Sequence, residues 1–227
     1  RLGRILPAIE FSIAGSILPN LGILHNSRLQ VTGEYYLHIR QNLMALPGVG
    51  LEGIEEVHSH PMALLQCVDF LDTHRWRLVE TEDTALSARR IAERGIRNAA
   101  AIAGDLAAEL FGLEIVAADI HSIRNNYTRF LVLRPDHQPI DERSDKASLC
   151  FKTDHRHGSL IRVLREMEDS TINMTKLQSS PIPSEPWHYM FHVDMEFACM
   201  DDYNRVIERM RSVTSELHVY GVYRKGQ

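Results

Sequence analysis

Apolar residues recur at helical and strand spacing through the first half of the chain, and the two spacings alternate. Leu64, Leu65, Val68 and Leu71 follow Pro61 at helical spacing, and proline is well tolerated in a helix's first turn. The predicted elements are, in chain order, a strand at 5–9, a helix from Pro61, a helix at 84–93 closed by Gly95, a strand at 99–103, a short helix ending at Phe111 before Gly112, and a strand at 113–116. This alternation predicts an α/β fold.

The second half of the chain shows a different order of elements. The patterns predict a strand at 147–151, a helix at 159–167, strands at 173–178 and 189–196, a helix at 203–213 and a strand at 217–222. The order βαββαβ predicts a four-stranded antiparallel sheet with helices on one face and an edge free to pair with a second copy. A polar stretch at 134–145 separates the two regions and is typical of a linker.

Polar side chains gather at the predicted ends of four elements. Asn126–Phe130 opens a strand with a hydroxyl, a guanidinium and an aromatic ring, and we expect Thr128 at its leading end, where function often lies. Ser59–Cys67 places a hydroxyl, an imidazole and Gln66 around a helix start, where free N–H groups attract anions. Asp83–Ala88 sets Thr84 and Ser87 at another helix start, a pattern that capping alone also explains. Ala8–Ser16 delivers Glu10 and then a glycine turn with two hydroxyls.

Composition excludes several classes of partner. The chain of 227 residues is 44% apolar and 24% charged with a net charge of -5, which argues against nucleic-acid binding because that requires a basic surface. Its longest apolar runs are far shorter than the ~20 residues of a membrane span, so no membrane partner is expected. Cys67, Cys150 and Cys199 fit neither a disulfide framework nor a paired metal motif, which favours a cytoplasmic location with reduced thiols. The start at Arg1, without methionine, indicates missing N-terminal sequence.

Histidines provide no convincing metal site. His155 with His157, and His58 with His60, alternate in polar surroundings, and no third ligand is close in sequence. We therefore expect no metal.

The four polar segments, in this order, resemble prephenate dehydratase. Pro7–Ser16 is similar to the family's P-I-E-N-S/T-x-x-G-S, Ser59–Cys67 to S-H-P-x-A-L-x-Q-C, Asp83–Ala88 to D-T-A-x-S-A, and Asn126–Phe130 to N-x-T-R-F. The second region resembles the ACT regulatory domain, with Gly158–Leu160 similar to G-A/S-L, Asn173–Pro181 to N-L-T-K-I-E-S-R-P, and Trp187–Asp194 to W-E-Y-x-F-Y-V-D. The resemblance implies a two-lobed, periplasmic-binding-protein-like catalytic domain at 1–137, a linker at 138–145 and a ferredoxin-like ACT domain at 146–227.

The resemblance also implies a reaction: prephenate loses water and carbon dioxide to give phenylpyruvate, with no cofactor. The expected catalytic residues are Thr128, which hydrogen-bonds the departing hydroxyl, Glu10, which if buried would supply the proton, and Ser59 and Gln66, which bind carboxylates. The expected substrate-binding residues are Ser12, Ser16, His60, Thr84, Ser87, Arg129 and Phe130. For Arg129 we favour a role in bracing the strand, because alternation sets it opposite Thr128.

The ACT-like region implies feedback by phenylalanine. Gly158, Ser159, Leu160 and Asn173 of one subunit are expected to face Gln178, Ser179, Ser180 and Pro181 of another, in a homodimer or homotetramer. Gln178 and Ser180 replace the glutamate and arginine of the family's E-S-R-P, which leaves the strength of binding open.

Two departures from the family pattern keep other functions open. Phe11 stands where the family has the asparagine of P-I-E-N, so a polar substrate contact is lost. Family members also begin with a further half-lobe carrying G-x-x-G-x-x-S, to which nothing here corresponds, so we expect an incomplete first lobe. The alternatives are a catalytically impaired amino-acid sensor and an arogenate dehydratase, whose substrate differs by an amino group.

Overall fold

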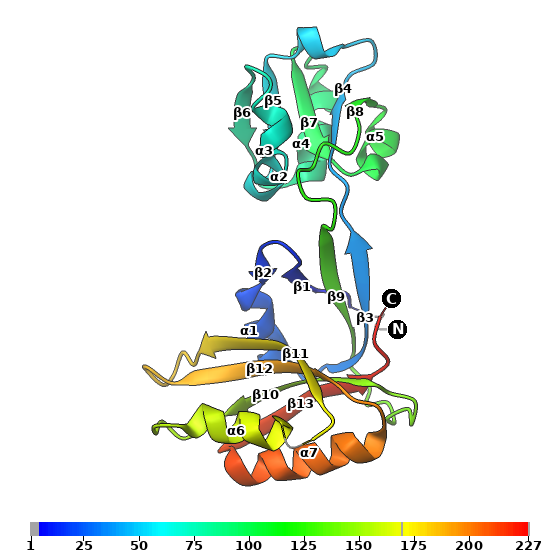
Figure 1. Cartoon of the computed structure of the whole chain (residues 1–227). Helices are drawn as coiled ribbons and strands as arrows, with labels where there is room; N and C mark the ends of the chain where they lie inside the picture. Colours follow the sequence, from blue (N-terminus) through cyan, green and yellow to red (C-terminus); the bar gives the residue numbers. More distant parts are fainter. Residues whose placement is uncertain (1–4, 169, 227) are drawn as a thin grey trace. The chain divides into compact units, whose positions relative to one another are not determined.

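The protein is described by a computed structural model that covers residues 5–168 and 170–226. The chain packs as two compact units, which are described one at a time (Figure 1). Unit 2 is the continuous segment His38–Asn126, and unit 1 contains the described residues up to Leu37 and from Tyr127 onward. The predicted linker at 138–145 lies inside unit 1, so this division does not coincide with the predicted domain boundaries, which stay a prediction.

Unit 2 is built on a five-stranded mixed sheet. Its strands, in spatial order, are β6 (Arg77–Glu80), β5 (Glu56–Ser59), β7 (Ala99–Ala103), β4 (Asn42–Ala45) and β8 (Glu114–Ala117). Strand β5 runs parallel to β6 and β7, whereas β4 is antiparallel to β7 and β8. The connections contain a 3-10 turn (Leu51–Gly53) and the helices α2 (Pro61–Gln66), α3 (Val68–Leu71), α4 (Thr84–Arg94) and α5 (Asp105–Phe111). This confirms the predicted mixture of strands and helices.

Both faces of this sheet are covered, and strand β7 shows how. Ala100 and Ile102 pack into a core with residues of α2 and α3, while Ala99, Ala101 and Ala103 pack against α4 and α5. Alternate residues of a strand face opposite sides, so a run of five small apolar residues fits a strand buried on both faces.

The predicted ends of α4 and α5 are confirmed. Gly95 and Gly112 follow them with φ of 63° and 65°, the left-handed conformation that glycine adopts without steric cost.

The helix predicted after Pro61 is broken into two short helices. At Cys67 the backbone leaves the helical region (φ -112°, ψ 15°), and the chain turns between α2 and α3. Leu64, Cys67 and Leu71 then share one core, whereas Leu65 and Val68 are exposed. The predicted continuous apolar face was therefore wrong for Leu65 and Val68.

Unit 1 contains a small sheet that combines three strands from the start of the chain with one strand that follows unit 2 in the sequence. Its strands, in spatial order, are β2 (Gly15–Ser16), β1 (Ala8–Phe11), β9 (Tyr127–Arg134) and β3 (Gln30–His38), with helix α1 (Leu18–Asn26) between β2 and β3. The strand predicted at 5–9 begins later, at Ala8, and Ile5 makes only an isolated bridge to Leu133. Helix α1, β3 and β4 were not predicted, because a proline, a glycine and several polar residues interrupt the apolar pattern there.

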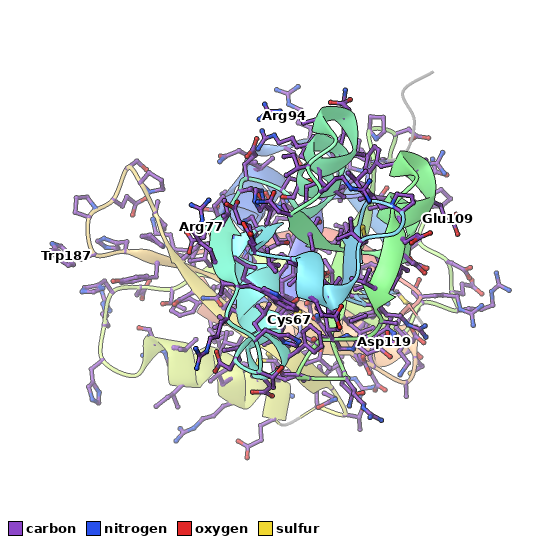
Figure 2. The ribbon with its side chains drawn as sticks, turned by 90° about the horizontal axis from the view of Figure 1, so that it is seen from above. Cys67, Arg77, Arg94, Glu109, Asp119 and Trp187 are labelled. Atoms are coloured by element: carbon purple, nitrogen blue, oxygen red, sulfur yellow. The ribbon has the colours of Figure 1, made fainter. Side chains whose placement is uncertain are left out.

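The rest of unit 1 has the predicted βαββαβ order. Strands β10 (Lys146–Lys152), β11 (Asn173–Pro181), β12 (Tyr189–Glu196) and β13 (Glu216–Tyr223) form an antiparallel sheet in the order β11-β12-β10-β13, the ferredoxin-like arrangement. Helices α6 (Ser159–Glu168) and α7 (Met200–Val213) cover one face, as predicted (Figure 1). Trp187, in the connection between β11 and β12, projects from the ribbon and is 80% exposed (Figure 2).

The other face of this C-terminal sheet is also covered, which was not predicted. Cys150, Met190 and Tyr220 of this sheet share a core with apolar residues of α1, β1, β3 and β9. The backbones approach closely at Gly221, where a Cβ atom would lie 1.9 Å from the carbonyl oxygen of Val31 on β3. Strand β10 is therefore buried on both sides, and the small N-terminal sheet and the C-terminal sheet form one packed body.

Candidate active site

Thr128 lies at the start of β9 in unit 1, as predicted. The residue is buried, and its hydroxyl forms no hydrogen bond to any residue that the structure describes. Its partner across the antiparallel ladder is Phe11 of β1. Directly opposed residues present their side chains on the same face of a sheet, so Phe11, the departure from the family pattern, stands beside the Thr128 hydroxyl.

Ser12 holds the start of this strand. Tyr127 N–H donates to Ser12 Oγ at 2.8 Å, and Ser12 N–H donates to the Tyr127 carbonyl at 2.8 Å. Ser16 of β2 pairs with Glu10 and is half-buried, and Phe130 is also half-buried. The structure thus gives Ser12 a structural contact beside the predicted catalytic strand.

The environment of Glu10 differs from the predicted one. The predicted role of Glu10 as proton source requires a carboxyl group buried among apolar side chains. Instead, the Glu10 side chain is 29% exposed and lies 3.0 Å from Lys176 Nζ and 3.5 Å from Arg129 NH1. Because two cations contact the carboxylate, the structure makes Glu10 an ion-pair partner, and we correct the role of proton source.

Arg129 braces the strand, and its assignment to the substrate-binding residues is corrected. Its side chain is 7% exposed, and its Nε donates to Glu34 Oε2 at 2.7 Å. Further partners are Asp194 and Tyr223, both from the C-terminal sheet. Burial by itself lowers the pKa of Arg129, but Asp194, Tyr223 and Glu34 offset this and raise it above its usual value, so the guanidinium is always charged.

Unit 2 contains the predicted carboxamide, Gln66, at the end of α2. Its Oε1 accepts hydrogen bonds from Gln41 Nε2 at 3.1 Å and from Asn126 Nδ2 at 3.0 Å. Two donors on the oxygen leave the Gln66 amide nitrogen as the group that can donate to a ligand. Asn126 Oδ1 is buried and has no hydrogen-bond partner among the described residues, so an acceptor lies beside this donor. Gln41 was missed from the sequence, since nothing distinguishes an isolated glutamine.

Two predicted hydroxyls of unit 2 are used inside the fold. Ser59, at the end of β5, has no exposed surface and donates to the Ile102 carbonyl of β7 at 2.7 Å. Ser87 is buried in α4 and bonds to the Asp83 carbonyl at 2.8 Å and to the Thr81 hydroxyl. Both differ from the predicted substrate contacts, because a hydroxyl donates only one hydrogen.

His60 and Thr84 occupy the helix starts at which they were predicted. His60 precedes α2, and its Nδ1 accepts the Met62 N–H at 3.2 Å, which leaves Nε2 as the possible donor of the neutral ring. Thr84 is half-buried at the start of α4, after the cap Asp83, and its hydroxyl bonds to no described residue.

The cysteines do not supply a nucleophile in the buried part of the molecule. Burial raises the pKa of Cys67 to about 12 and that of Cys150 to about 11, so neither is a thiolate near neutral pH. Within residues 5–168 and 170–226 no cluster of three or more His, Cys, Asp or Glu is arranged to hold a metal ion. No helix in the described part of the chain has the length and apolar character to cross a membrane.

Comparison with known proteins agrees with the motifs. The family model described as prephenate dehydratase matches residues 3–138, a range that contains all four polar segments. The chain belongs to the prephenate dehydratase family. The match ends near the C-terminal sheet, so the resemblance of that region to an ACT domain stays a prediction.

Curated relatives of the prephenate dehydratase family cover nearly the whole chain. The bifunctional chorismate mutase/prephenate dehydratase of Neisseria gonorrhoeae is 37% identical over 225 residues, which are 96% of this chain and 61% of that protein. Arogenate dehydratase/prephenate dehydratase 2, chloroplastic, of Arabidopsis thaliana is 35% identical over 96% of this chain and 60% of its own length. The chain therefore spans about three fifths of the curated relatives that it matches.

Solved structures share the fold. Prephenate dehydratase from Arthrobacter aurescens, determined in complex with L-Phe, gives a TM-score of 0.86 at 26% identity over 97% of this chain and 74% of that chain. A protein described as the quorum quenching acylase GqqA gives a TM-score of 0.88 at 26% identity, over 97% of this chain and 81% of its own.

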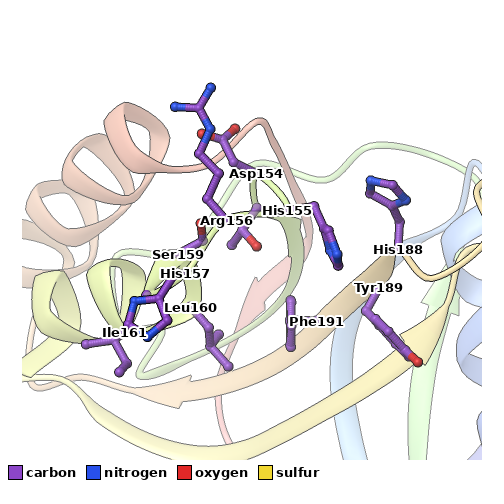
Figure 3. Close-up of a pocket in the computed structure, with 12 residues that line it drawn as sticks. Asp154, His155, Arg156, His157, Ser159, Leu160, Ile161, His188, Tyr189 and Phe191 are labelled. Atoms are coloured by element: carbon purple, nitrogen blue, oxygen red, sulfur yellow. The ribbon is translucent and has the colours of Figure 1, made fainter.

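The effector residues predicted from the sequence motifs fall into separate groups. Gly158, Ser159 and Leu160 line a pocket of about 500 Å³ with Tyr189 and Phe191 of β12 (Figure 3). Ser179 and Pro181 of β11 pair with these two β12 residues, whereas Gln178 and Ser180 pair with His192 and Met190. Alternation therefore sets Ser180 on the opposite face, where its hydroxyl lies 2.9 Å from His192 Nε2.

Asn173 does not join this pocket within one subunit. It pairs with Glu196 at the far end of the hairpin, eight positions along β11 from Pro181. At about 3.3 Å per residue the separation is roughly 26 Å. Asn173 thus lies apart from the residues that line this pocket, and its predicted part in an effector site between subunits stays a prediction.

Proposed function

We propose that the chain catalyses the prephenate dehydratase reaction, the conversion of prephenate to phenylpyruvate, water and carbon dioxide. The observation that carries this proposal is the Thr128 hydroxyl at the start of β9, which bonds to no described residue in a chain of this family. A hydroxyl that the fold leaves unused remains available to a substrate.

In the proposed reaction two bonds of prephenate break. The bond from the ring to the C4 hydroxyl breaks as that group takes up a proton from the solvent and leaves as water. The bond from the ring to its carboxylate breaks as carbon dioxide leaves, and its electron pair completes the aromatic ring. Thr128 donates a hydrogen bond to the departing oxygen, and a positioned donor of this kind contributes about 10²–10⁴-fold.

Binding of the substrate is assigned to donors that the fold leaves free. The Gln66 oxygen already accepts two hydrogen bonds, so its amide nitrogen is assigned to a substrate carboxylate. The hydroxyl of Thr84 and the Nε2–H of His60 are further donors in unit 2. Glu10 has no part in proton transfer because Lys176 and Arg129 contact it.

The experiment is a phenylpyruvate assay with this chain and its Thr128→Ala variant. We expect Thr128→Ala to lower kcat by about 10²-fold or more, with the melting temperature unchanged within about 2 °C. Thr128→Ser keeps the hydroxyl and is expected to retain most of the activity. Absence of turnover in the parent chain, or near-normal turnover in Thr128→Ala, would overturn the proposal.

We further propose that phenylalanine binds the pocket around Gly158–Leu160 and inhibits the reaction. Its volume of about 500 Å³ and its aromatic wall of Tyr189 and Phe191 suit an amino acid with a phenyl ring. The relative from Arthrobacter aurescens was solved with L-Phe, which supports the same ligand class here. The edge strand β11 is proposed to pair with a second copy, as a dimer or tetramer, and the free cysteines suit a cytoplasmic location.

Calorimetric titration with L-phenylalanine tests the pocket. We expect binding to the parent chain and a loss of affinity of at least about tenfold in Leu160→Arg, because the charge enters an apolar wall. Leu110→Arg, on an exposed position of α5, is the control and should bind normally. No heat of binding at millimolar ligand would contradict the effector proposal and leave the dehydratase proposal standing.

Two other functions have specific observations in their favour. Phe11 beside Thr128 favours a sensor that binds phenylalanine without turnover. Relatives named arogenate dehydratase favour arogenate as substrate, which differs from prephenate by an amino group. Parallel assays with both substrates separate these cases: turnover of arogenate alone supports the arogenate dehydratase, and phenylalanine binding without any turnover supports the sensor.

A further inference from the structure

Arg129, the residue after Thr128, is held by strands from both sheets of unit 1. Its guanidinium contacts Glu10 of β1, Glu34 of β3, Asp194 of β12 and Tyr223 of β13. The first two belong to the small N-terminal sheet, and the last two belong to the C-terminal sheet. One side chain next to the proposed catalytic hydroxyl is therefore fixed partly by the C-terminal sheet.

The surroundings of this guanidinium contain further charged and polar side chains, which we name the Arg129 cluster. Its members are Glu10, Glu34, Arg129, Lys146, Ser148, Lys176, Asp194 and Tyr223. Lys146 Nζ lies 3.0 Å from Glu34 Oε1, and Lys176 Nζ forms its ion pair with Glu10 but no hydrogen bond among the described residues. Within the cluster three cations face three carboxylates, and Glu196, which lies 3.9 Å from Lys146, has a cation of its own in Lys225.

The cluster is dry. Side-chain exposure is 1% for Glu34, 4% for Lys146 and 7% for both Arg129 and Asp194. The cavity beside Arg129 and Asp194 has a volume of about 10 Å³, roughly the space of one water molecule. Removal of one partner therefore leaves a charge that water cannot reach, and the strand that carries it must move or lose its fixed geometry.

Asp194 is the strongest link between Arg129 and the C-terminal sheet. One carboxylate oxygen accepts from Arg129 NH1, and the other accepts from the Ser148 hydroxyl on the opposed position of β10. Ser148 also lies 2.6 Å from the Tyr223 hydroxyl, which contacts Arg129 in turn at 3.2 Å. Both oxygens of Asp194 are thus engaged, so this carboxylate has a single orientation.

We propose that Asp194 is a positioning residue for the dehydratase reaction: from the C-terminal sheet it fixes Arg129, and through Arg129 it holds the Thr128 hydroxyl in place. The proposal rests on the proposed function of Thr128. Thr128 and Arg129 are adjacent on β9, so a rotation of the Arg129 peptide moves the neighbouring hydroxyl. A displacement of about 1 Å at a reacting group can cost about 10²-fold in rate.

The test measures kcat, KM and folded fraction of the full chain in Asp194→Asn and Ser148→Ala. Asp194→Asn keeps the shape but removes the charge, and we expect kcat to fall between about tenfold and about 10²-fold with KM within about twofold. Ser148→Ala keeps the charge and frees one oxygen of Asp194, so we expect a smaller fall in kcat than in Asp194→Asn. This variant carries the test if Asp194→Asn does not fold. Glu185→Gln, which breaks the half-exposed Lys152–Glu185 pair, is the matched control with unchanged kcat.

A double-mutant cycle distinguishes positioning from general stability. If Asp194 acts through Arg129, Asp194→Asn lowers kcat much less in an Arg129→Met background than in the parent chain. Additive losses, a change in KM alone, or a fall in kcat that only follows the folded fraction by circular dichroism would each overturn the inference. Failure of the proposed function is recognised separately, since the parent chain would then show no turnover that depends on Thr128.

Discussion

At the scale of single residues, Phe11 occupies the position whose substitution should most improve catalysis. It opposes Thr128 across the β1–β9 ladder and replaces the asparagine of the family motif. A phenyl ring offers no hydrogen bond to a dianionic substrate, whereas a carboxamide does. The residue beside the proposed catalytic hydroxyl is therefore apolar where its relatives' motif is polar.

We predict that Phe11→Asn raises kcat/KM for prephenate by about tenfold. One hydrogen bond to a charged group contributes about 1.5 kcal/mol, which corresponds to that factor. Steady-state kinetics of phenylpyruvate formation measure the change. Ile13→Asn, two positions on in the exposed turn, is the control, and an unchanged kcat/KM in Phe11→Asn would refute the expectation.

We also predict that Gln66→Glu weakens substrate binding without unfolding unit 2. A glutamate still accepts from Gln41 and Asn126, but it loses the free amide donor and adds a negative charge against a dianion. KM for prephenate is expected to rise at least about tenfold while the melting temperature changes little. An unaltered KM would show that the Gln66 amide does not meet the substrate.

The sequence identified the candidate polar residues of the site, but it did not show which hydroxyls are already hydrogen-bonded within the fold. Ser59 and Thr128 look alike as polar residues at element ends, yet Ser59 donates to Ile102, a carbonyl 43 positions away. Arg129 finds its partners 65 and 94 positions away in Asp194 and Tyr223. Contacts of this length depend on strand register, which local patterns do not specify.

At the scale of elements, the approach of β13 to β3 controls how unit 1 is packed. Gly221 opposes Ser148 on β10 and lies against the backbone of Val31. The βαββαβ order was predictable from periodicity, because each element buries one or both faces. The packing of α1 and β3 on the second face of this sheet was not predictable, because the apolar periodicity of these two elements is weak.

We predict that Gly221→Ala destabilises the protein by about 3 kcal/mol, or prevents folding. The new Cβ would meet the Val31 carbonyl at 1.9 Å, and backbone cannot yield as a flexible side chain can. Urea unfolding measures the loss. Gly22→Ala in α1 is the matched control, because a Cβ atom added there would meet no atom within 4 Å and alanine favours helix by about 0.5–1 kcal/mol.

At the scale of the whole molecule, stability should depend on pH through His192. Its ring is buried, with Tyr220 OH 3.1 Å from Nδ1 and Ser180 Oγ 2.9 Å from Nε2. Burial, together with nearby His25 and Lys176 and against the opposing effect of Asp194, lowers the pKa of His192 to about 4. The folded protein thus holds this histidine neutral where an unfolded chain would protonate it.

We predict that the free energy of unfolding falls by up to about 3 kcal/mol between about pH 6.5 and pH 4 because of this group. In that interval the unfolded chain binds a proton that the folded chain excludes, so acid favours unfolding. Urea unfolding at several pH values of the parent and His192→Gln isolates the contribution, since Asp194 and the other carboxylates titrate in both. Parallel pH profiles of the two proteins would contradict the assignment.

The Arg129 cluster also limits how this chain can be recombined. Its members come from β1, β3 and β9 on one side and from β10 to β13 on the other, so the predicted linker at 138–145 joins parts that complete each other. A chimera that exchanges the C-terminal region with that of a relative would inherit a guanidinium whose counterions belong to the discarded half. Such exchanges should succeed only when Glu34, Arg129, Lys146 and Asp194 travel as a matched set.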